Sequence, residues 1–424
     1  MNEREAIEYI HSVNWQFCKP GLDRIGKLCA YLGNPQDKLK FIHVAGTNGK
    51  GSFSAMLDCI LRRAGYKVGL FTSPYILEFN ERMRVGGENI PGDELAAIVE
   101  YVKGFADKMQ DKPTEFELIT AIGFEYFYRS GCDYVILECG MGGKLDSTNI
   151  INTAILSVIT TISLDHTAFL GDTVEKIAAE KAGIIKENTP ILWCGDDNAA
   201  YSVISKRANE LGVKLYTPDK EINIKSATLD GTVFDCGEYK DIKIHLLGAY
   251  QPKNARNVIC ACEILRGAGL EITNKNIYDG LSEAVWRARF EIINKNPTFI
   301  FDGGHNPEGV VAATESIKEY LGNGKVCVVT GVMADKDYLF IADRISEIAD
   351  FVFTVTPDNP RALDAGKYAD VYKDRGIDAR GYDNLPLAVK DAMEYARKKN
   401  IPILALGSLY MYTEVIEALK SLTD

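Results

Sequence analysis

A glycine-rich loop between a predicted strand and a predicted helix constrains the fold more than any other feature of the chain. The β-rich run 41–45 predicts a strand, and the run 53–64, closed by Gly65, predicts a helix. Glycines let such a loop turn tightly so that several backbone N–H groups point at one anion. The helix N-terminus adds its dipole and Lys50 adds a positive charge. The order of strand, loop and helix therefore predicts a site for nucleotide phosphates. The loop consists of Gly46, Thr47, Asn48, Gly49, Lys50, Gly51 and Ser52.

This loop departs from the common GxxxxGK[ST] pattern. It is shorter, and Gly51 separates Lys50 from the hydroxyl residue Ser52. The alternative interpretation is a structural strand-to-helix turn with a solvated lysine. The strand and the helix stand in the required order, which favours phosphate binding.

Short β-rich runs alternate with helix-length segments from residue 41 onwards, and this rhythm predicts a doubly wound, mostly parallel α/β sheet. Between about 213 and 247 the pattern changes to strand-like alternation with a turn at Asp230-Gly231, which predicts a small antiparallel insert. Besides 41–45, the predicted strands of the first series are 67–71, 134–139 and 154–159, and the further predicted helices are 115–129 and 254–265.

A polar break at 294–297 precedes a second series of strands. We therefore expect a nucleotide-binding first domain over residues 1–296, which includes the antiparallel insert, and a smaller, Rossmann-like α/β domain over residues 297–424. The length agrees with two domains, because 424 residues exceed the roughly 250–300 at which one core stops growing. The strands of the second series are predicted at 298–301, 325–330, 351–356 and 401–406.

Charge and composition argue against several classes of partner. A net charge of −11 disfavours binding to DNA or RNA backbones, so we expect no nucleic-acid partner. The ten cysteines include no CxxC pair, as expected for reduced, buried side chains. The charged start of the chain leads into no apolar run, and the uncharged stretch 147–164 is rich in Asn, Thr and Ser. We therefore expect no signal peptide, no membrane span and a cytoplasmic location.

Polar side chains stand at the ends of three further predicted strands. Ser73, Glu138 and His166 occupy these positions. Because ligands bind beyond the carboxyl ends of parallel strands, we expect these groups to lie near Lys50 in a magnesium–nucleotide site. A histidine ligand is unusual for Mg²⁺, so Mn²⁺ is an alternative metal. Taken singly, the three residues have simpler interpretations as a turn serine, a paired structural carboxylate and an interior histidine.

A lysine interrupts the apolar face of another predicted helix. The helix 172–186 is expected to begin with Asp172 as its N-cap, and Lys181 lies in the middle of its apolar stripe. A lysine in that position must extend to solvent, form a pair or be modified. The stripe consists of Val174, Ile177, Ala178 and Ile185.

Several long motifs, in order along nearly the whole chain, resemble the folylpolyglutamate and dihydrofolate synthases of the Mur ligase superfamily. The resemblance implies an ATP-dependent, amide-forming ligase. It also implies that the lysine matching Lys181 is carbamylated and organises a second metal ion. The segments that carry the resemblance are Val44–Ser52, Leu137–Asn149, Glu180–Ile184, Arg289-Phe290, Phe301–Pro307 and Pro360–Ala362.

The same resemblance implies a role for each matched residue. Catalytic roles fall to Lys50, Lys181 and His305. The implied ATP contacts are the loop 46–52, Asn254, Arg289 and Asp302; the metal ligands are Ser73, Glu138, His166 and carbamylated Lys181; and the folate contacts are Leu145, Asp146 and Ser147.

The implied reaction has two steps. A folate carboxylate attacks the γ-phosphate of ATP to give an acyl phosphate, and the amine of L-glutamate then displaces phosphate. Water must be excluded because it would hydrolyse the mixed anhydride, which two closing domains would achieve. The expected partners are ATP, Mg²⁺, L-glutamate and either reduced folate or dihydropteroate. The family implies a monomer.

Two alternative functions are a peptidoglycan-precursor Mur ligase and a nucleotide-dependent switch. A peptidoglycan-precursor Mur ligase carries a uridine-nucleotide domain before the phosphate loop, for which the 45 residues before Gly46 are too few. A nucleotide-dependent switch would need neither a folate loop nor a lysine such as Lys181. Phosphate release that depends on both folate and glutamate distinguishes the ligase from the switch.

Overall fold

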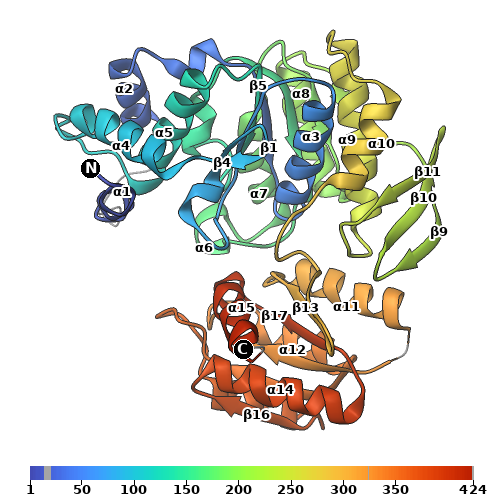
Figure 1. Cartoon of the computed structure of the whole chain (residues 1–424). Helices are drawn as coiled ribbons and strands as arrows, with labels where there is room; N and C mark the ends of the chain where they lie inside the picture. Colours follow the sequence, from blue (N-terminus) through green and yellow to red (C-terminus); the bar gives the residue numbers. More distant parts are fainter. Residues whose placement is uncertain (14–20, 323, 423–424) are drawn as a thin grey trace. The chain divides into compact units, whose positions relative to one another are not determined.

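The computed structural model describes residues 1–13, 21–322 and 324–422 (Figure 1). By their internal contacts the residues form two compact units. The first contains Met1–Glu221 and Asn254–Ala284, and the second contains Ile222–Lys253 and Val285–Asp424. The chain therefore passes from one unit to the other at three places.

An eight-stranded sheet forms the centre of the first unit, in the order β4-β3-β2-β5-β1-β6-β7-β8. The six strands from β2 to β8 in this order are parallel, and β3 and β4 add an antiparallel edge. The predicted parallel sheet is thus confirmed, and the antiparallel edge strands β3 and β4 were not predicted. The strands are β1 (Phe41–Ala45), β2 (Val68–Phe71), β3 (Met83–Val85), β4 (Glu88–Asn89), β5 (Tyr134–Glu138), β6 (Ala154–Ile159), β7 (Ile191–Trp193) and β8 (Leu215–Tyr216).

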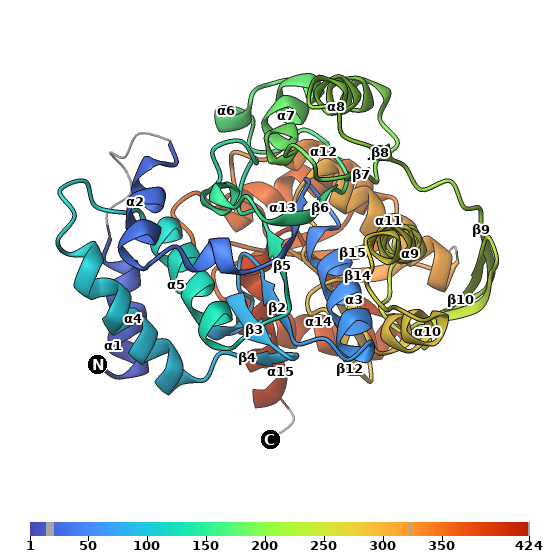
Figure 2. The same cartoon turned by 90° about the horizontal axis from the view of Figure 1, so that it is seen from above.

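Helices cover both faces of this sheet (Figure 2). Phe41 and Leu137 pack with α1, α2, α4 and α5, while Ala45 and Ile159 pack with α7 and α8, all on one face. Right-handed crossovers place α3 on the opposite face, where α10 packs beside it. The helices are α1 (Glu3–His11), α2 (Asp23–Tyr31), α3 (Lys50–Arg63), α4 (Gly92–Ala106), α5 (Glu115–Arg129), α6 (Thr167–Leu170), α7 (Val174–Lys181), α8 (Asn198–Glu210), α9 (Gln251–Gly267) and α10 (Asn274–Glu283).

The helix that carries Lys181 is shorter than predicted. Its N-cap is Thr173, whose side chain accepts a hydrogen bond from the backbone N–H of Lys176, so the predicted cap Asp172 is wrong. The α-helical turns end at Lys181 and continue as the 3₁₀ turn η4 (Ala182–Ile184). Lys181 therefore stands at the C-terminal end of α7.

A six-stranded sheet forms the second unit, in the order β12-β13-β17-β14-β15-β16. All neighbours are parallel except β12 and β13, and helices α11 to α15 accompany the sheet. The elements are β12 (Glu291–Lys295), β13 (Thr298–Asp302), α11 (Pro307–Leu321), β14 (Val326–Thr330), α12 (Tyr338–Ser346), β15 (Ala349–Val355), α13 (Ala365–Lys373), β16 (Ala379–Tyr382), α14 (Leu385–Lys399), β17 (Ile403–Leu406) and α15 (Tyr412–Ser421).

The predicted antiparallel insert is a three-stranded sheet of β9 (Ile222–Thr228), β10 (Gly231–Cys236) and β11 (Tyr239–Ile244). Its β9–β10 turn lies at Asp230-Gly231, as predicted. The insert belongs to the second unit by its contacts, since Tyr320 of α11 accepts a hydrogen bond from the Gly248 N–H at 3.0 Å.

The division between the units differs from the predicted one at 296/297. It falls between Ala284 and Val285, and the polar break at 294–297 is the turn of the β12–β13 hairpin. Asn294 stabilises this turn by donating from Nδ2 to the Pro297 carbonyl at 2.8 Å. Asn and Pro favour tight turns as readily as linkers, which explains the difference.

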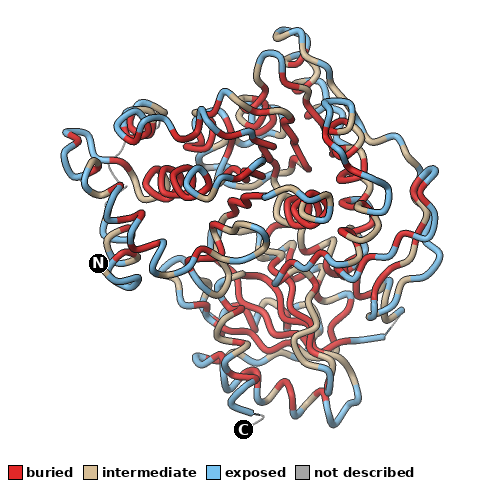
Figure 3. Tube along the Cα trace, turned by 45° about the horizontal axis from the view of Figure 1, so that its top comes forward, coloured by how far each residue is buried: buried red, intermediate tan, exposed pale blue. Residues whose placement is uncertain are grey.

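Burial follows the expected pattern, with the strands of both sheets mostly buried (Figure 3). The uncharged stretch 147–164 contains strand β6, as predicted. No helix among the described residues is long and apolar enough to cross a membrane. The nine described cysteines are free thiols.

Candidate active site

The glycine-rich loop has the conformation that its sequence predicts. Strand β1 ends at Ala45 and α3 begins at Lys50, with Gly49 as N-cap at φ +84°. Gly46 has φ +151°, and a Cβ there would lie 1.8 Å from Thr160 Oγ1. Glycine is therefore required at both positions. The first N–H groups of α3 have no acceptor within the helix, which makes this end suitable for an anion.

The segment after β6 braces this loop. Thr47 donates its N–H to the Thr161 carbonyl at 2.7 Å and accepts the Ser163 N–H on Oγ1 at 3.1 Å. Thr160 donates from Oγ1 to the Asn48 carbonyl at 2.7 Å. The amide of Thr47 is thus used within the fold, which leaves the amides nearer α3 as the candidates for phosphate binding. These bracing threonines were not predicted, because no local pattern marks them.

Lys50 lies folded across the loop. Its Nζ donates to the carbonyls of Gly46 at 3.1 Å and Thr47 at 3.2 Å, and it lies 3.8 Å from Glu138 Oε1. Glu138 is buried at the end of β5. Asn254 reaches the same loop from α9, since a Cβ on Gly49 would lie 3.1 Å from its Oδ1. The side chains of Lys50, Glu138 and Asn254 thus lie at the loop.

Ser73 follows β2, Glu138 ends β5 and His166 comes after β6. In the sheet β5 and β6 flank β1, and β2 lies on the far side of β5. Ser73 is half-buried, and His166 is exposed at φ +50°, so it is not the interior histidine of the simpler interpretation. Among the described residues no three His, Cys, Asp or Glu side chains gather as a metal cluster. One buried carboxylate beside the phosphate loop nevertheless fits Mg²⁺, which takes most of its ligands from phosphates and water.

Lys181 is buried beneath the same loop. Its Nζ donates to the Gly46 carbonyl at 2.9 Å, and its relative exposure is 4%, so it does not extend to solvent. Burial, and then the neighbouring charge of Lys50, lower the pKa of Lys181 to about 7. A large fraction of this amine is therefore neutral at physiological pH.

The folate loop, residues 140–147, contains the predicted folate contacts and packs closely against the end of α7. A Cβ on Gly143 would lie 2.8 Å from the Glu180 carbonyl oxygen, and one on Gly183 would lie 2.4 Å from Lys144 Cα. This contact fixes the loop next to Lys181.

The predicted folate residues have different exposures. Leu145 is 47% exposed, whereas Asp146 and Ser147 are buried. Asp146 accepts hydrogen bonds from the Met141 N–H at 2.8 Å and from the Thr148 N–H at 3.0 Å, and burial raises its pKa. Leu145 can meet a substrate directly, and Asp146 shapes the loop from within.

In the second unit, Asp302 holds a strained segment in place. Its carboxylate accepts hydrogen bonds from the Phe290 N–H at 2.9 Å, the Gly304 N–H at 2.7 Å and the Tyr250 hydroxyl at 3.1 Å. Burial raises the pKa of Asp302. Ala288 and Phe290 have φ of +56° and +46°, so both residues beside Arg289 adopt a left-handed conformation that costs energy.

His305 lies in the loop that leads from β13 to α11. Its Nδ1 is 3.0 Å from the Gly303 carbonyl, which can only accept, so Nδ1 carries the proton. The second unit thus presents Arg289, Asp302 and His305 together at the carboxyl end of β13.

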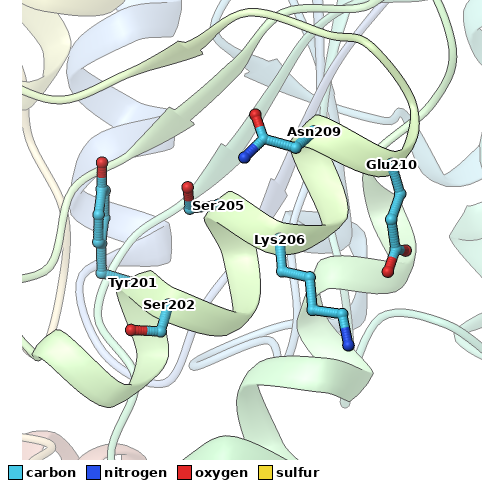
Figure 4. Close-up of a pocket in the computed structure, with 6 residues that line it drawn as sticks. All are labelled: Tyr201, Ser202, Ser205, Lys206, Asn209 and Glu210. Carbon is cyan, nitrogen blue, oxygen red and sulfur yellow. The ribbon is translucent and has the colours of Figure 1, made fainter.

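Two surface hollows lie away from these groups. One of about 650 Å³ covers the outer face of α8, where Tyr201, Ser205 and Asn209 lie on one side and Lys206 and Glu210 on the other (Figure 4). The other, of about 370 Å³, touches the folate loop only at Lys144. Neither contains a predicted catalytic residue, so the strand ends remain the candidate site.

Two family profiles match the chain. The profile "Mur ligase middle domain" matches residues 44–262, and "Mur ligase, glutamate ligase domain" matches residues 288–409. The dihydrofolate synthase/folylpolyglutamate synthase of Bacillus subtilis is 36% identical and covers 98% of this chain and 99% of its own length. The folylpolyglutamate synthase of Lacticaseibacillus casei is 35% identical, with 99% of each chain covered.

Solved structures agree with the fold. The folylpolyglutamate synthase of Thermotoga maritima superposes with a TM-score of 0.85 at 32% identity and covers 99% of this chain and 97% of its own. E. coli FolC in complex with DHPP and ADP superposes with a TM-score of 0.85 at 30% identity and covers 100% and 99%. This chain therefore belongs to the folylpolyglutamate synthase and dihydrofolate synthase family of Mur ligases, which are ATP-dependent, amide-forming ligases.

Proposed function

We propose that this chain uses ATP to join L-glutamate to the terminal carboxylate of a reduced folate, through an acyl phosphate. The observation that carries the proposal is the meeting of the phosphate loop, Glu138, Lys181 and the folate loop at neighbouring strand ends of one sheet. A relative's solved complex with AMPPCP and folate supports the choice of substrates.

In the first step the substrate carboxylate attacks the γ-phosphate, the bond between the γ-phosphorus and the bridging oxygen breaks, and ADP leaves. Lys50 lies where it can balance the charge that develops on the transferred phosphoryl group. In the second step the amine of glutamate attacks the acyl carbon, loses a proton and expels phosphate. Arg289, Asp302 and His305 are proposed to complete the ATP site from the second unit.

Mg²⁺, or Mn²⁺ as a substitute, would be held by Glu138, with Ser73 and His166 bound directly or through water. When bound, the ion would neutralise phosphate charge. The fit rests on the buried carboxylate of Glu138 beside Lys50.

Lys181 is proposed to be carbamylated. A neutral amine attacks the carbon of CO₂, an N–C bond forms, and one proton is released to give a carbamate anion. The lowered pKa of Lys181 supplies the neutral amine that this reaction needs. A buried ammonium next to Lys50 is costly, and the carbamate removes that charge and supplies an anion for a second metal ion. The mass of the intact protein in bicarbonate tests this, because carbamylation adds one CO₂. Short carboxylic acids should partly restore the activity of Lys181→Ala, because they supply the missing anion.

A second activity, the conversion of dihydropteroate to dihydrofolate, is favoured by the names of two relatives. The relatives from B. subtilis and E. coli are named dihydrofolate synthase/folylpolyglutamate synthase, and they are 36% and 32% identical to this chain. A cytoplasmic location and a monomeric state stay predictions.

Parallel incubations with tetrahydrofolate and with dihydropteroate, each with ATP and labelled glutamate, test the proposal. Product masses should increase by one or more glutamate residues, and phosphate release should require both the folate and glutamate. Phosphate release without either substrate would instead support a nucleotide switch.

A further inference from the structure

A buried histidine connects the centre of the sheet to the folate loop. His43 lies in the middle of β1 and is fully buried. Its Nε2 is 2.9 Å from Thr148 Oγ1 and 3.1 Å from Cys139 Sγ. Within the described part of the chain its Nδ1 has no hydrogen-bond partner. All the polar contacts of this imidazole thus converge on one nitrogen.

The direction of the hydrogen bonds follows from Asp146. Thr148 Oγ1 is 2.5 Å from Asp146 Oδ1, and this carboxylate already accepts two backbone N–H groups. The Thr148 hydroxyl therefore donates its single proton to Asp146 Oδ1. Thr148 Oγ1 must then accept from His43, so His43 carries its proton on Nε2. Burial, followed by the charge of Lys186, lowers the pKa of His43 to about 3, and the ring is neutral.

The relay of His43, Thr148 and Asp146 joins segments that are 105 residues apart in sequence. Asp146 is buried, and its bonds to the Met141 and Thr148 N–H groups set the path of the loop. The exposed neighbours Met141 and Leu145 take their positions from that path.

We propose that His43 is a positioning residue for substrate binding, which holds the folate loop in its binding shape through Thr148 and Asp146. The inference rests on the proposed function for the identity of the substrate, a folate. The nucleotide site does not depend on the relay, because the phosphate loop is braced separately by residues 160–163.

Kinetics of Thr148→Val and Thr148→Ser test the relay. Valine keeps the shape but breaks the link to Asp146 and leaves the His43 N–H only the weak acceptor Cys139 Sγ. The KM for the folate should therefore rise about tenfold, while the KM for ATP stays within about twofold. Serine keeps the hydroxyl and should restore the folate KM. Thr189→Val is the matched control, because it loses a buried hydroxyl that bonds the Ala154 carbonyl at 2.9 Å elsewhere in the unit. An unchanged folate KM in Thr148→Val overturns the proposal.

The tautomer of His43 supplies a test that needs no activity. ¹⁵N NMR of histidine-labelled protein should show one ring, assigned by its loss in His43→Gln, with the proton on Nε2 and no titration between pH 5.5 and 8. A proton on Nδ1, or titration in that range, overturns the relay even if Thr148→Val fails to fold. Wild-type protein that makes no glutamylated folate would contradict the proposed function, whereas an active wild type with the wrong tautomer contradicts only this inference.

Discussion

Lys50 and Lys181 donate hydrogen bonds to the same carbonyl oxygen, that of Gly46, at 3.1 and 2.9 Å. Two ammonium groups at such short range repel each other, and burial makes the cost larger for Lys181. Burial, and then the charge of Lys50, lower the pKa of Lys181. One peptide carbonyl therefore couples the phosphate loop to the end of α7.

Replacing Lys50 by Ala removes the charge that is proposed to contact the transferred phosphoryl group. We expect turnover to fall at least about a hundredfold, or about 2.7 kcal/mol, with an unchanged circular dichroism spectrum. Lys27→Ala on the exposed surface of α2 is the control and should keep full turnover. Near-normal turnover of purified Lys50→Ala would exclude the loop as the phosphate site.

The titration of Lys181 should make stability depend on pH in a defined direction. Its folded pKa is about 7 against an unfolded 10.5, so between these values the unfolded chain binds the extra proton. In CO₂-free buffer the free energy of unfolding of wild type should therefore rise with pH, relative to Lys181→Met, from about pH 7 to 10.5. Urea unfolding at several pH values measures this, and parallel curves for the two proteins would contradict the buried lysine.

Asp302→Ala should lower the stability of the second unit by about 1–3 kcal/mol, because the N–H groups of Phe290 and Gly304 lose their acceptor. Asp302→Asn keeps an acceptor oxygen, so the stability of the second unit should fall less than in Asp302→Ala. Differential scanning calorimetry measures both, with the exposed Asp383→Ala as control. The KM for ATP should rise in Asp302→Ala if this residue contacts the nucleotide.

Sequence predicts those site residues that a local pattern marks. The phosphate loop and the strand-end positions of Ser73 and Glu138 follow from adjacency along the chain. The relay from His43 does not, because Thr148 is 105 residues away and only the folded sheet brings the two together. The inward orientation of Asp146 is likewise set by amides that no periodicity identifies.

At the scale of elements, α3 depends on close packing with α10. Gly280 of α10 lies so near α3 that a Cβ would be 2.6 Å from Ile60 Cα. Backbone atoms on both sides leave no flexible group that can move away. The position of the helix that begins at Lys50 is therefore set partly by a segment more than two hundred residues later.

Gly280→Ala should consequently destabilise the first unit by about 1–3 kcal/mol. Gly104→Ala is the matched control, because this α4 glycine has open space around its missing Cβ and alanine favours the helix by about 0.5–1 kcal/mol. Chemical denaturation of both variants measures the contrast. Equal stability would show that α3 and α10 can separate freely.

Elements with a clear local pattern were predicted well, and strands that depend on pairing with a neighbour were not. Strand β1 and helix α5 have the predicted bounds, since a β-rich run of five residues and a fifteen-residue amphipathic run determine them. Strands β4 and β12 span two and five residues and exist through pairing with a neighbour, which local sequence does not encode. The same reason explains why the division into compact units differs from the predicted boundary.

At the scale of the whole molecule, the insert is attached to the second unit through Tyr320. Its hydroxyl accepts the Gly248 N–H at 3.0 Å and lies 3.4 Å from Thr232 Oγ1. Tyr320→Phe should therefore raise hydrogen exchange in the 248–250 segment and in β10 by about tenfold or more. Tyr395→Phe, which loses a bond to Asp350 in the same unit, is the control and should leave the insert protected.

The threefold passage of the chain between units has a consequence for synthesis on the ribosome. The insert is translated before α9 and α10, yet the first unit is complete only at Ala284 and the partner helix α11 begins at Pro307. During translation the strands of the insert are therefore synthesised before α11, the helix against which they pack. The remaining segment of the first unit, residues 254–284, is synthesised in between. Pausing or a chaperone acting on this interval would therefore affect the yield of folded protein more than the same delay elsewhere in the chain.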